Sequence, residues 1–343
     1  MRTHSPDRFE TEHRETLSTL IHGGVKQRQV VYVAAKLRLA DMLHEGPRHG
    51  SDLATAVGAT ADTFYRLLRG LVAQGLLFED QEGRFGLTPV GQFLSGGGVG
   101  SLRGEAIVHA ELDQAWCCLL HSVRSGETAF NHAFGAGVFE PFARDPDASE
   151  YFHRWMAASI ADVIPDVIRA YPFPREGTVV DIGGGYGSLL IAVLQQQPGL
   201  RGVLVDVPQV VAGARVPIAD AGLLGRCETE AHDFFKSVPA GGDIYILQRI
   251  VHDWDDDQAS RILRNCRNAM SSSARLLLIE KIMPERVTDA PGVAFLDLNM
   301  LVETGGVQRS EDQYRRLLTS CGFCLARVVA TDSDTSVIEA VPA

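Results

Sequence analysis

The sequence predicts a doubly wound α/β domain preceded by a smaller helical domain of the winged-helix type. From residue 178 onward short apolar strands alternate with helices, which is typical of a parallel sheet covered by helices on both faces. At the start of that region a β-branched strand, 179–182, runs into a glycine cluster and then into an apolar helix, 189–194. A helix, turn, helix and hairpin pattern within the first hundred residues predicts the smaller domain.

The length and composition are those of a globular protein with two structural units. The chain has 343 residues, 45% apolar and 22% charged, and we expect domains at 1–100 and 101–343 that meet at a glycine-rich stretch, 95–100. No apolar run approaches the roughly 20 residues that span a bilayer, and the first residues are polar. These features predict a cytoplasmic protein without a leader or membrane anchor. The net charge of −11 argues against nucleic acid or an anionic membrane as a partner.

The smaller domain has two competing interpretations. We expect helices within 10–45, 51–57 and 60–72, a hairpin of strands 76–79 and 84–87, and a helix starting in 88–94. A winged helix of this kind can bind DNA, and a ligand-responsive regulator stays open as an alternative. However, the second helix of the unit carries Tyr65, Leu67, Leu68 and Leu71, which we expect to be buried. A packing or dimerisation module is therefore favoured.

Two groups of residues stay unassigned at this level. The helical segment 101–170 holds many large side chains, and the sequence does not separate those that line a pocket from those of the core. The members of this group are His109, Trp116, His121, Phe130, His132, Phe134, Phe139, Phe142, Tyr151, Phe152, Trp155 and Met156. Of six scattered cysteines, Cys321 and Cys324 have the spacing of a redox pair, but they stand where a helix turns into a strand. Packing cysteines are favoured there, and no metal site is expected.

The alternating region predicts a Rossmann-like sheet. Strands are expected at 179–182, 203–207, within 227–233, and at 243–247, 275–280, 323–330 and 336–340, the last two as an antiparallel edge pair. One helix is expected to begin with residues 209–214, and two more are expected at 258–270 and 312–320. The ligand of such a sheet lies at the carboxyl ends of its strands.

Polar and aromatic residues follow these strands where a nucleotide-type ligand would lie. Asp206 ends the second strand, 21 residues after Gly185, where an acidic side chain can bind ribose hydroxyls. Asp233 and Phe234 follow the third strand and offer a carboxylate and an aromatic wall to an adenine. A dinucleotide fingerprint would need a third glycine where the chain has Ser188, so NAD fits poorly. S-adenosylmethionine fits better, because its carboxylate can meet the N-terminus of the helix after the glycines.

Several motifs resemble one enzyme family, in order and over nearly the whole chain. They lie at 67–77, 179–187, 204–208, 232–235, 250–254 and 305–310. The sequence resembles the class I S-adenosylmethionine-dependent O-methyltransferases of the caffeic-acid and hydroxyindole type, including bacterial members that tailor antibiotics and other secondary metabolites. The resemblance implies a homodimer through the N-terminal domain and a small aromatic, phenolic substrate.

The resemblance also implies which residues bind the cofactor, which leaves as S-adenosylhomocysteine. They are Gly183, Gly185, Asp206, Asp233, Phe234, Gln248, Trp254 and Ser159, with Met156 close by. Gln248 departs from the lysine or serine that is frequent in the family.

His252 matches the family's general base, Glu280 its carboxylate partner, and Gln308 stands where the family has a second glutamate. A histidine has a pKa of about 6.5 and a phenol one of about 10, a difference of about 3.5 units. Complete deprotonation of the phenol before attack would therefore cost about 5 kcal/mol. We expect the proton to be transferred within the transition state instead. Glutamine cannot offset positive charge, and Glu303 is a candidate for the missing carboxylate. A packed histidine is the alternative for His252. C- or N-methylation, or tailoring without methyl transfer, is the alternative for the reaction.

Overall fold

The computed structural model describes residues 24–96, 101–138, 140, 151–152, 155–156 and 159–343. The chain divides into two compact units, residues 1–113 and 114–343. The helix Arg103–Trp116 (α6) contains the division. The expected boundary at residue 100 stays a prediction, because residues 97–100 lie outside the described part. Phe139 and Phe142 lie outside it as well.

The first unit is a winged helix. Its helices are α2 Val25–Lys36, α3 Leu39–Met42, α4 Gly50–Ala56 and α5 Ala61–Ala73, with a 3-10 turn at Gly91–Leu94. Its strands β1 Arg48–His49, β2 Leu77–Glu79 and β3 Arg84–Leu87 form a sheet of order β1-β3-β2. Leu68 and Leu71 of α5 are buried with Phe85 of β3, as expected. The expected burial of Tyr65 is wrong: its side chain is 42% exposed and covers Phe85 edge-on, with ring centroids 5.8 Å apart.

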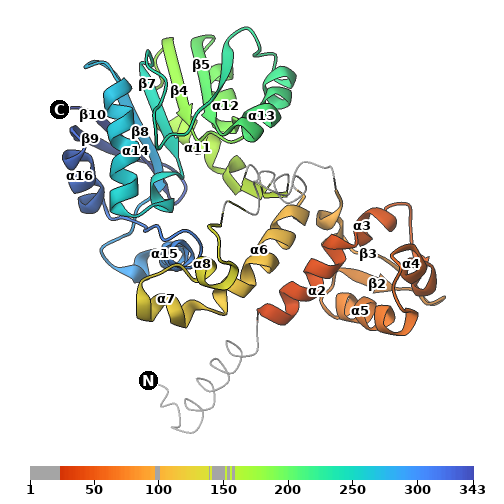
Figure 1. The fold of residues 1–343 in the computed structure, drawn as a ribbon. Coiled ribbons are helices and arrows are strands. Elements are labelled where there is room, and N and C mark those ends of the chain that lie inside the picture. The colour runs from red at the N-terminus through yellow and green to blue at the C-terminus, as the bar shows by residue number, and fades with distance from the viewer. Residues whose placement is uncertain (1–23, 97–100, 139, 141–150, 153–154, 157–158) are drawn as a thin grey trace, which may run out of the picture. The chain divides into compact units, whose positions relative to one another are not determined.

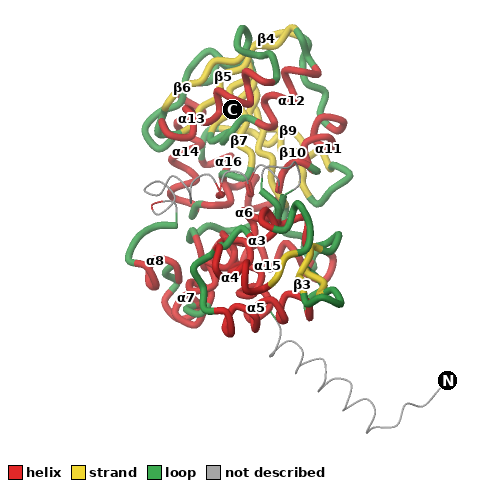
Figure 2. The backbone as a smooth tube through the Cα atoms, turned by 90° about the vertical axis from the view of Figure 1, so that its right-hand side faces the viewer, coloured by secondary structure: helices red, strands yellow, loops and turns green. Residues whose placement is uncertain are grey.

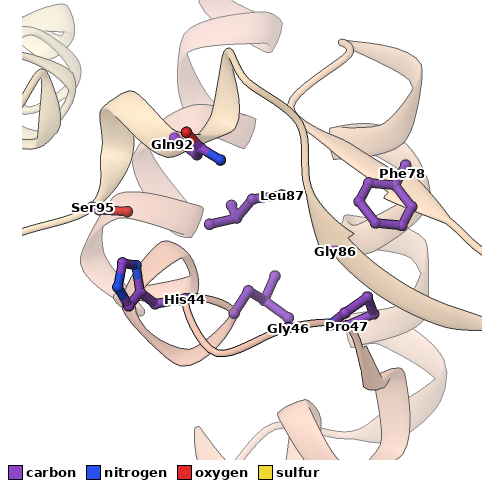
Figure 3. Close-up of a pocket in the computed structure, with 9 residues that line it drawn as sticks. His44, Gly46, Pro47, Phe78, Gly86, Leu87, Gln92 and Ser95 are labelled. Carbon is purple, nitrogen blue, oxygen red and sulfur yellow. The ribbon is translucent and has the colours of Figure 1, made fainter.

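A hollow of about 460 Å³ lies in this first unit (Figure 3). Its lining residues are Leu43, His44, Gly46, Pro47, Phe78, Gly86, Leu87, Gln92 and Ser95. His44, Gln92 and Ser95 supply the polar side chains, and the others are apolar or glycine. None of these side chains pairs a base with a carboxylate, so the hollow has no group arranged for acid–base chemistry.

The second unit contains a seven-stranded sheet of order β6-β5-β4-β7-β8-β10-β9. The strands are β4 Glu176–Ile182, β5 Gly199–Asp206, β6 Cys227–Ala231, β7 Ile244–Gln248, β8 Arg275–Lys281, β9 Phe323–Ala330 and β10 Thr335–Pro342. The first five are parallel, whereas β10 pairs antiparallel with both β8 and β9. The predicted antiparallel pair is thus present. The strand order reverses beside β4, which places the expected ligand crevice at the end of that strand.

Helices cover both faces of this sheet (Figures 1 and 2). One face packs against α11 Val163–Ala170, α12 Ser188–Gln196 and α13 Pro208–Asp220, and the other against α14 Asp256–Ala269 and α16 Glu311–Ser320. Asp255 caps α14 by accepting a hydrogen bond from Gln258 N, and Ser310 and Gln313 form a capping box on α16. Residues 276–279 of β8 are fully buried, as expected for a strand with helices on both faces.

Three further helices of this unit, α7 Leu119–Ser125, α8 Ala129–Phe134 and α15 Pro291–Glu303, pack together beside the sheet (Figure 1). Short 3-10 turns occur at Val251–Asp253 (η2) and Val287–Asp289 (η3). Within the described ranges, no helix is long and apolar enough to cross a membrane.

The two cysteines with redox spacing point into different surroundings. Cys321 is buried, with its thiol 3.6 Å from the carbonyl of Ser260, whereas Cys324 is exposed on β9. Both are free thiols. Cys321 therefore fits the packing interpretation, whereas for Cys324, which is exposed, that interpretation is wrong. In the described part of the chain, no group of three or more His, Cys, Asp or Glu side chains is placed to hold a metal ion.

Candidate active site

The glycine turn after β4 depends on glycine for its backbone conformation. Gly183 and Gly185 have φ of 68° and 59°, in the left-handed region that side chains rarely adopt. A Cβ on Gly183 would also lie 2.6 Å from Cδ1 of Ile250, which follows β7. The turn therefore lets β4 and the segment after β7 approach closely.

Asp206 at the end of β5 is tied to this turn. Its Oδ2 accepts a hydrogen bond from Gly185 N (2.9 Å), and its Oδ1 accepts one from Val207 N (2.7 Å). Burial raises the pKa of this carboxyl, and the two backbone donors oppose the rise. The predicted link between the acidic residue and the glycines is thus a direct contact.

An aromatic group follows β6 and β7. Phe235 and Trp254 meet edge-on with ring centroids 4.7 Å apart, and Phe234 lies 6.2 Å from Trp254. Asp233, next to Phe234, is largely exposed and forms an ion pair with Lys236 (3.0 Å), which lowers the pKa of the carboxyl. The structure brings these predicted residues together beside the sheet end, with Asp233 at the surface.

A small cavity of about 70 Å³ lies at the glycine turn. Its lining residues are Met156, Ile160, Gly183, Gly184, Gly185, Tyr186, Ser188, Gln248 and Arg249. The cavity joins the glycines to two residues predicted from resemblance, Met156 and Gln248.

Two buried hydrogen-bond donors line this cavity. Gln248 Nε2 and Arg249 Nε are buried and have no hydrogen-bond partner among the residues that the structure describes. Arg249 adopts φ of 53°, rare for a residue with a side chain, and its Nη1 donates to Ser159 Oγ (2.8 Å). Ser159 Oγ in turn donates to the carbonyl of Met156 (2.8 Å). Sequence reasoning missed Arg249, because its position in the motif gave no sign of the backbone turn that directs it.

His252 lies in η2 and is almost completely buried, with 3% of its surface exposed. Its Nδ1 lies 3.2 Å from Oε2 of Glu280 and 2.7 Å from the side-chain nitrogen of Gln308. The other oxygen of Glu280 accepts hydrogen bonds from the backbone N–H groups of Val251 (3.0 Å) and His252 (3.3 Å). The three residues predicted as catalytic are therefore in contact, although they come from three separate parts of the chain.

The protonation states of this group follow from burial. Burial, and then the positive charge of Arg249, holds the pKa of His252 well below its usual value, so the imidazole is neutral near pH 7. Burial raises the pKa of Glu280 to about 8. An amide donates a hydrogen bond through its nitrogen and accepts one through its oxygen. Exchanging the two atoms of Gln308 would therefore let its oxygen accept a hydrogen bond from Nδ1–H. A neutral histidine with its proton on Nδ1 has a free lone pair on Nε2, which is the form that a base requires.

The loop after α15 holds η2 in place. Val307 N donates to the carbonyl of His252 (2.9 Å), and a Cβ on Gly306 would lie only 2.0 Å from the same oxygen. Arg309 is fully buried and donates to the carbonyls of Val251 (2.9 Å) and Trp254 (2.8 Å). The sequence predicted this loop as a motif but gave no role to Arg309, whose contacts with Val251, Trp254 and Asp256 join segments more than 50 residues apart.

Sequence reasoning also missed Asp253 and misplaced Glu303. Asp253 Oδ1 lies 3.4 Å from His252 Nε2, and burial raises the pKa of Asp253 to about 7. Glu303, expected as a substitute for the second family glutamate, is not among the ion-pair partners of His252 within the described residues. That expectation is wrong, because Glu303 ends α15 before the loop turns toward Nδ1.

Comparison with known proteins assigns the chain to a family. Residues 116–324 match the O-methyltransferase domain, and residues 20–96 match the O-methyltransferase dimerisation domain. The chain is 42% identical over 315 residues to a phenazine O-methyltransferase of Lysobacter antibioticus, covering 92% of each. It is 37% identical to an 8-amino-8-demethylriboflavin N,N-dimethyltransferase of Streptomyces davaonensis, covering 90% of each.

A solved structure shows the same relationship. An O-methyltransferase from neocarzinostatin biosynthesis, crystallised with S-adenosylmethionine and 2-hydroxy-5-methyl naphthoic acid, matches with a TM-score of 0.83 and 32% identity, covering 94% of this chain and 98% of that one. The chain belongs to the O-methyltransferase family. The predicted fold class and family are confirmed.

Proposed function

We propose that this protein transfers a methyl group from S-adenosylmethionine to a phenolic hydroxyl of a small aromatic natural product, with His252 as the general base. The observation that carries the proposal is the buried, neutral His252, whose Nδ1 is contacted by Glu280 and Gln308. His252 follows three residues after Arg249, which lines the cavity at the glycine turn. A base in this state beside a cofactor site is what methylation of a hydroxyl requires.

The residues around the cavity fit the cofactor. Gln248 Nε2 and Arg249 Nε are buried donors without an acceptor in the described structure, and the carboxylate of S-adenosylmethionine would supply one. The N-terminus of α12 begins at Ser188 beside the same cavity and also favours an anion. The bound cofactor supplies a methyl group on a positively charged sulfur.

The adenosine part would lie along the ends of β5 and β6. Asp206 is assigned to the ribose hydroxyls, and Asp233 with Phe234 to the adenine, packed by Trp254. The contact between Asp206 and Gly185 and the aromatic group around Trp254 support these roles. Ser159 would contact the cofactor through the arginine that it already binds.

His252 would take the phenolic proton on Nε2 as the hydroxyl oxygen attacks the methyl carbon. Because the protein lowers the pKa of His252, the mismatch with a phenol exceeds the roughly 5 kcal/mol expected from ordinary pKa values. Proton transfer therefore accompanies attack. Glu280, whose pKa is raised to about 8, offsets the charge that develops on the ring when its carboxyl is ionised. Gln308 orients the imidazole without contributing a charge.

The chain is proposed to act as a homodimer assembled through the unit that matches the dimerisation domain. No nucleic acid or membrane partner is proposed. N-methylation is the second candidate, because a relative of this chain is an N,N-dimethyltransferase and Gln308 makes base activation weaker than a glutamate would.

The test is incubation of the full-length protein with S-adenosylmethionine and matched phenol, aniline and carbon-nucleophile acceptors. Mass spectrometry of the product, with S-adenosylhomocysteine released in equal amount, identifies methyl transfer, and NMR identifies the methylated atom. Methylation of the phenol supports the proposal. Methylation of nitrogen or carbon alone supports the alternatives, and an altered product without a new methyl group would reject methyl transfer. Salt-sensitive DNA binding by the whole protein would instead favour the regulator.

A further inference from the structure

Gln308 allows His252 to adopt a second tautomer. The side-chain nitrogen of Gln308 lies 2.7 Å from Nδ1 of His252, and an amide nitrogen can only donate, so Nδ1 is the acceptor in this arrangement. The ring proton is then on Nε2. An ionised glutamate at position 308 could only accept from Nδ1–H, whereas the amide supports either tautomer through its nitrogen or its oxygen. The ring can therefore present Nε2 as a lone pair or as an N–H donor.

Glu280 also supports the tautomer with the proton on Nε2. Its Oε2 lies 3.2 Å from Nδ1 of His252 and has no hydrogen-bond partner within the described ranges. Burial raises the pKa of Glu280 to about 8, so its carboxyl is mostly protonated at neutral pH and its O–H can donate to Nδ1. Either group at Nδ1 can thus be the donor, which leaves the ring proton on the nitrogen that faces the substrate.

The charges around the ring favour a bound anion. Arg309 is fully buried and donates to backbone carbonyls on both sides of His252, whereas its ion-pair partner Asp256 is 78% exposed to solvent. Arg249, three residues before His252, adds a second positive charge. Asp253 Oδ1 lies 3.4 Å from Nε2, but burial raises the pKa of this carboxyl to about 7, so it is only partly ionised at neutral pH. A negatively charged oxygen at Nε2 would therefore be stabilised by the N–H donor and the two arginines.

We propose that the protein also methylates acidic aromatic hydroxyls that are already ionised at neutral pH, with Nε2–H of His252 donating a hydrogen bond to the phenolate oxygen. In acceptors of this class the hydroxyl is conjugated with a ring carbonyl, as in a hydroxyquinone. The inference rests on the proposed methyl transfer and extends it to a second class of acceptor. The phenolate oxygen forms a bond to the methyl carbon while the methyl–sulfur bond breaks and its electron pair stays on sulfur. No proton has to move, so His252 acts as a donor and not as a base.

This donor role agrees with the features that weaken His252 as a base. Burial and the positive charges of Arg249 and Arg309 hold the pKa of His252 well below its usual value, and Gln308 adds no negative charge. These features oppose the formation of an imidazolium, but they do not impair a neutral N–H donor. The same positive charges attract a phenolate.

The test compares 2-hydroxy-1,4-naphthoquinone, which is ionised at neutral pH, with 2-naphthol, an ordinary phenol that stays protonated there. Turnover with S-adenosylmethionine at neutral pH gives kcat/KM for each acceptor. His252→Gln keeps an amide N–H in place of Nε2–H but has no basic nitrogen. It should lower kcat/KM for 2-naphthol by about a hundredfold or more, the contribution of a general base, and for the naphthoquinone by less than about tenfold.

His252→Leu removes the donor as well as the base. Calorimetry with the protein loaded with S-adenosylhomocysteine should show that the Kd of the naphthoquinone is about tenfold higher in His252→Leu than in His252→Gln, the effect of one hydrogen bond to a charged group. The Kd of 2-naphthol should be the same in both variants. Glu311→Gln, an exposed change on α16, is the control and leaves all these values unchanged. A general loss of stability would weaken both acceptors equally and so leaves their ratio unaltered.

Three results would overturn the inference and leave the proposed function standing, provided that the wild type methylates 2-naphthol. They are an equal loss of kcat/KM for both acceptors in His252→Gln, an equal Kd of the naphthoquinone in the two variants, and no methylation of the naphthoquinone by the wild type. Methylation of the naphthoquinone but not of 2-naphthol would support the inference and reject His252 as a base toward ordinary phenols. Failure with both acceptors would reject the inference and the proposed aromatic substrate class together.

Discussion

The side-chain amide of Gln308 lies 2.7 Å from Nδ1 of His252, the same ring nitrogen that Oε2 of Glu280 approaches to 3.2 Å. One carboxyl, whose pKa burial raises to about 8, and one neutral amide therefore both contact the nitrogen that orients the imidazole. In the family that the sequence resembles, the position of Gln308 holds a second glutamate. The electrostatic support of the proposed base is thus weaker in this chain than a pair of carboxylates would give.

Gln308→Glu should strengthen the base. The added carboxylate stabilises the imidazolium and raises the pKa of His252 from its depressed value. Because a stronger base becomes protonated at a higher pH, the acidic limb of the kcat/KM profile should move upward by about one pH unit, and the alkaline plateau should rise. The exposed change Gln195→Glu on α12 is the control. An unchanged profile in Gln308→Glu would show that Gln308 does not act through the proton of His252.

Gly306→Ala should impair catalysis by displacing η2. The new Cβ would lie 2.0 Å from the carbonyl oxygen of His252, so the backbone must shift. A displacement of about 1 Å can cost about a hundredfold in rate, so kcat should fall by that order while the Kd for S-adenosylmethionine changes little. Gly292→Ala, in the first turn of α15, is the matched control because nothing lies within 4 Å of its Cβ. Equal activity of the two variants would contradict the account.

Gln248→Leu should weaken binding of the cofactor's amino-acid moiety selectively. Gln248 Nε2 is a buried donor without a described partner, and we assign it to the carboxylate. Calorimetry should show a Kd for S-adenosylmethionine raised roughly tenfold or more, as expected for a hydrogen bond to a charged group. The Kd for 5′-methylthioadenosine, which lacks the carboxylate, should stay the same. An equal loss for both ligands would place Gln248 elsewhere.

Asp181→Asn should change how stability depends on pH. Asp181 is buried under the glycine turn, and burial, followed by the charge of Asp206, raises its pKa from 3.8 to about 7. A carboxyl with a raised folded pKa favours folding at low pH, and that contribution is lost as the pH rises toward 7. The asparagine variant should therefore gain on the wild type by about 1.4 kcal/mol per pH unit between about pH 4 and pH 7.

Denaturant unfolding across this pH range measures the difference between Asp181→Asn and the wild type. Asp220→Asn, at the exposed end of α13, should follow the wild type at every pH. A constant difference between Asp181→Asn and the wild type would mean that the buried carboxyl keeps its ordinary pKa.

The glycine turn and Asp206 could be predicted because their signals are local. Residues at the carboxyl ends of neighbouring parallel strands lie close together. The positions of the strand ends were therefore enough to predict that Gly185 and Asp206 are neighbours, and the structure shows a hydrogen bond between them. The grouping of His252, Glu280 and Gln308 was predicted from motifs of a resembling family, since periodicity gives no contact between segments so far apart.

What could not be predicted depends on long-range packing. The positive φ of Arg249 and the hydrogen bonds of Arg309 depend on neighbours from other elements. The same holds for the aromatic segment after residue 100. Trp116 proves to bind Asn299, and His121 stacks on His132 with centroids 3.9 Å apart, although both histidines were equally plausible as core residues.

The most direct measurement of the central proposal is methyl transfer by His252→Ala to an identified phenolic substrate, with the Kd for S-adenosylmethionine measured in parallel. We expect kcat to fall by about a hundredfold to ten-thousandfold, the usual contribution of a general base, while the cofactor Kd stays within a few fold of the wild type. Full methyl-transfer activity in His252→Ala would contradict the assignment of His252 as the base.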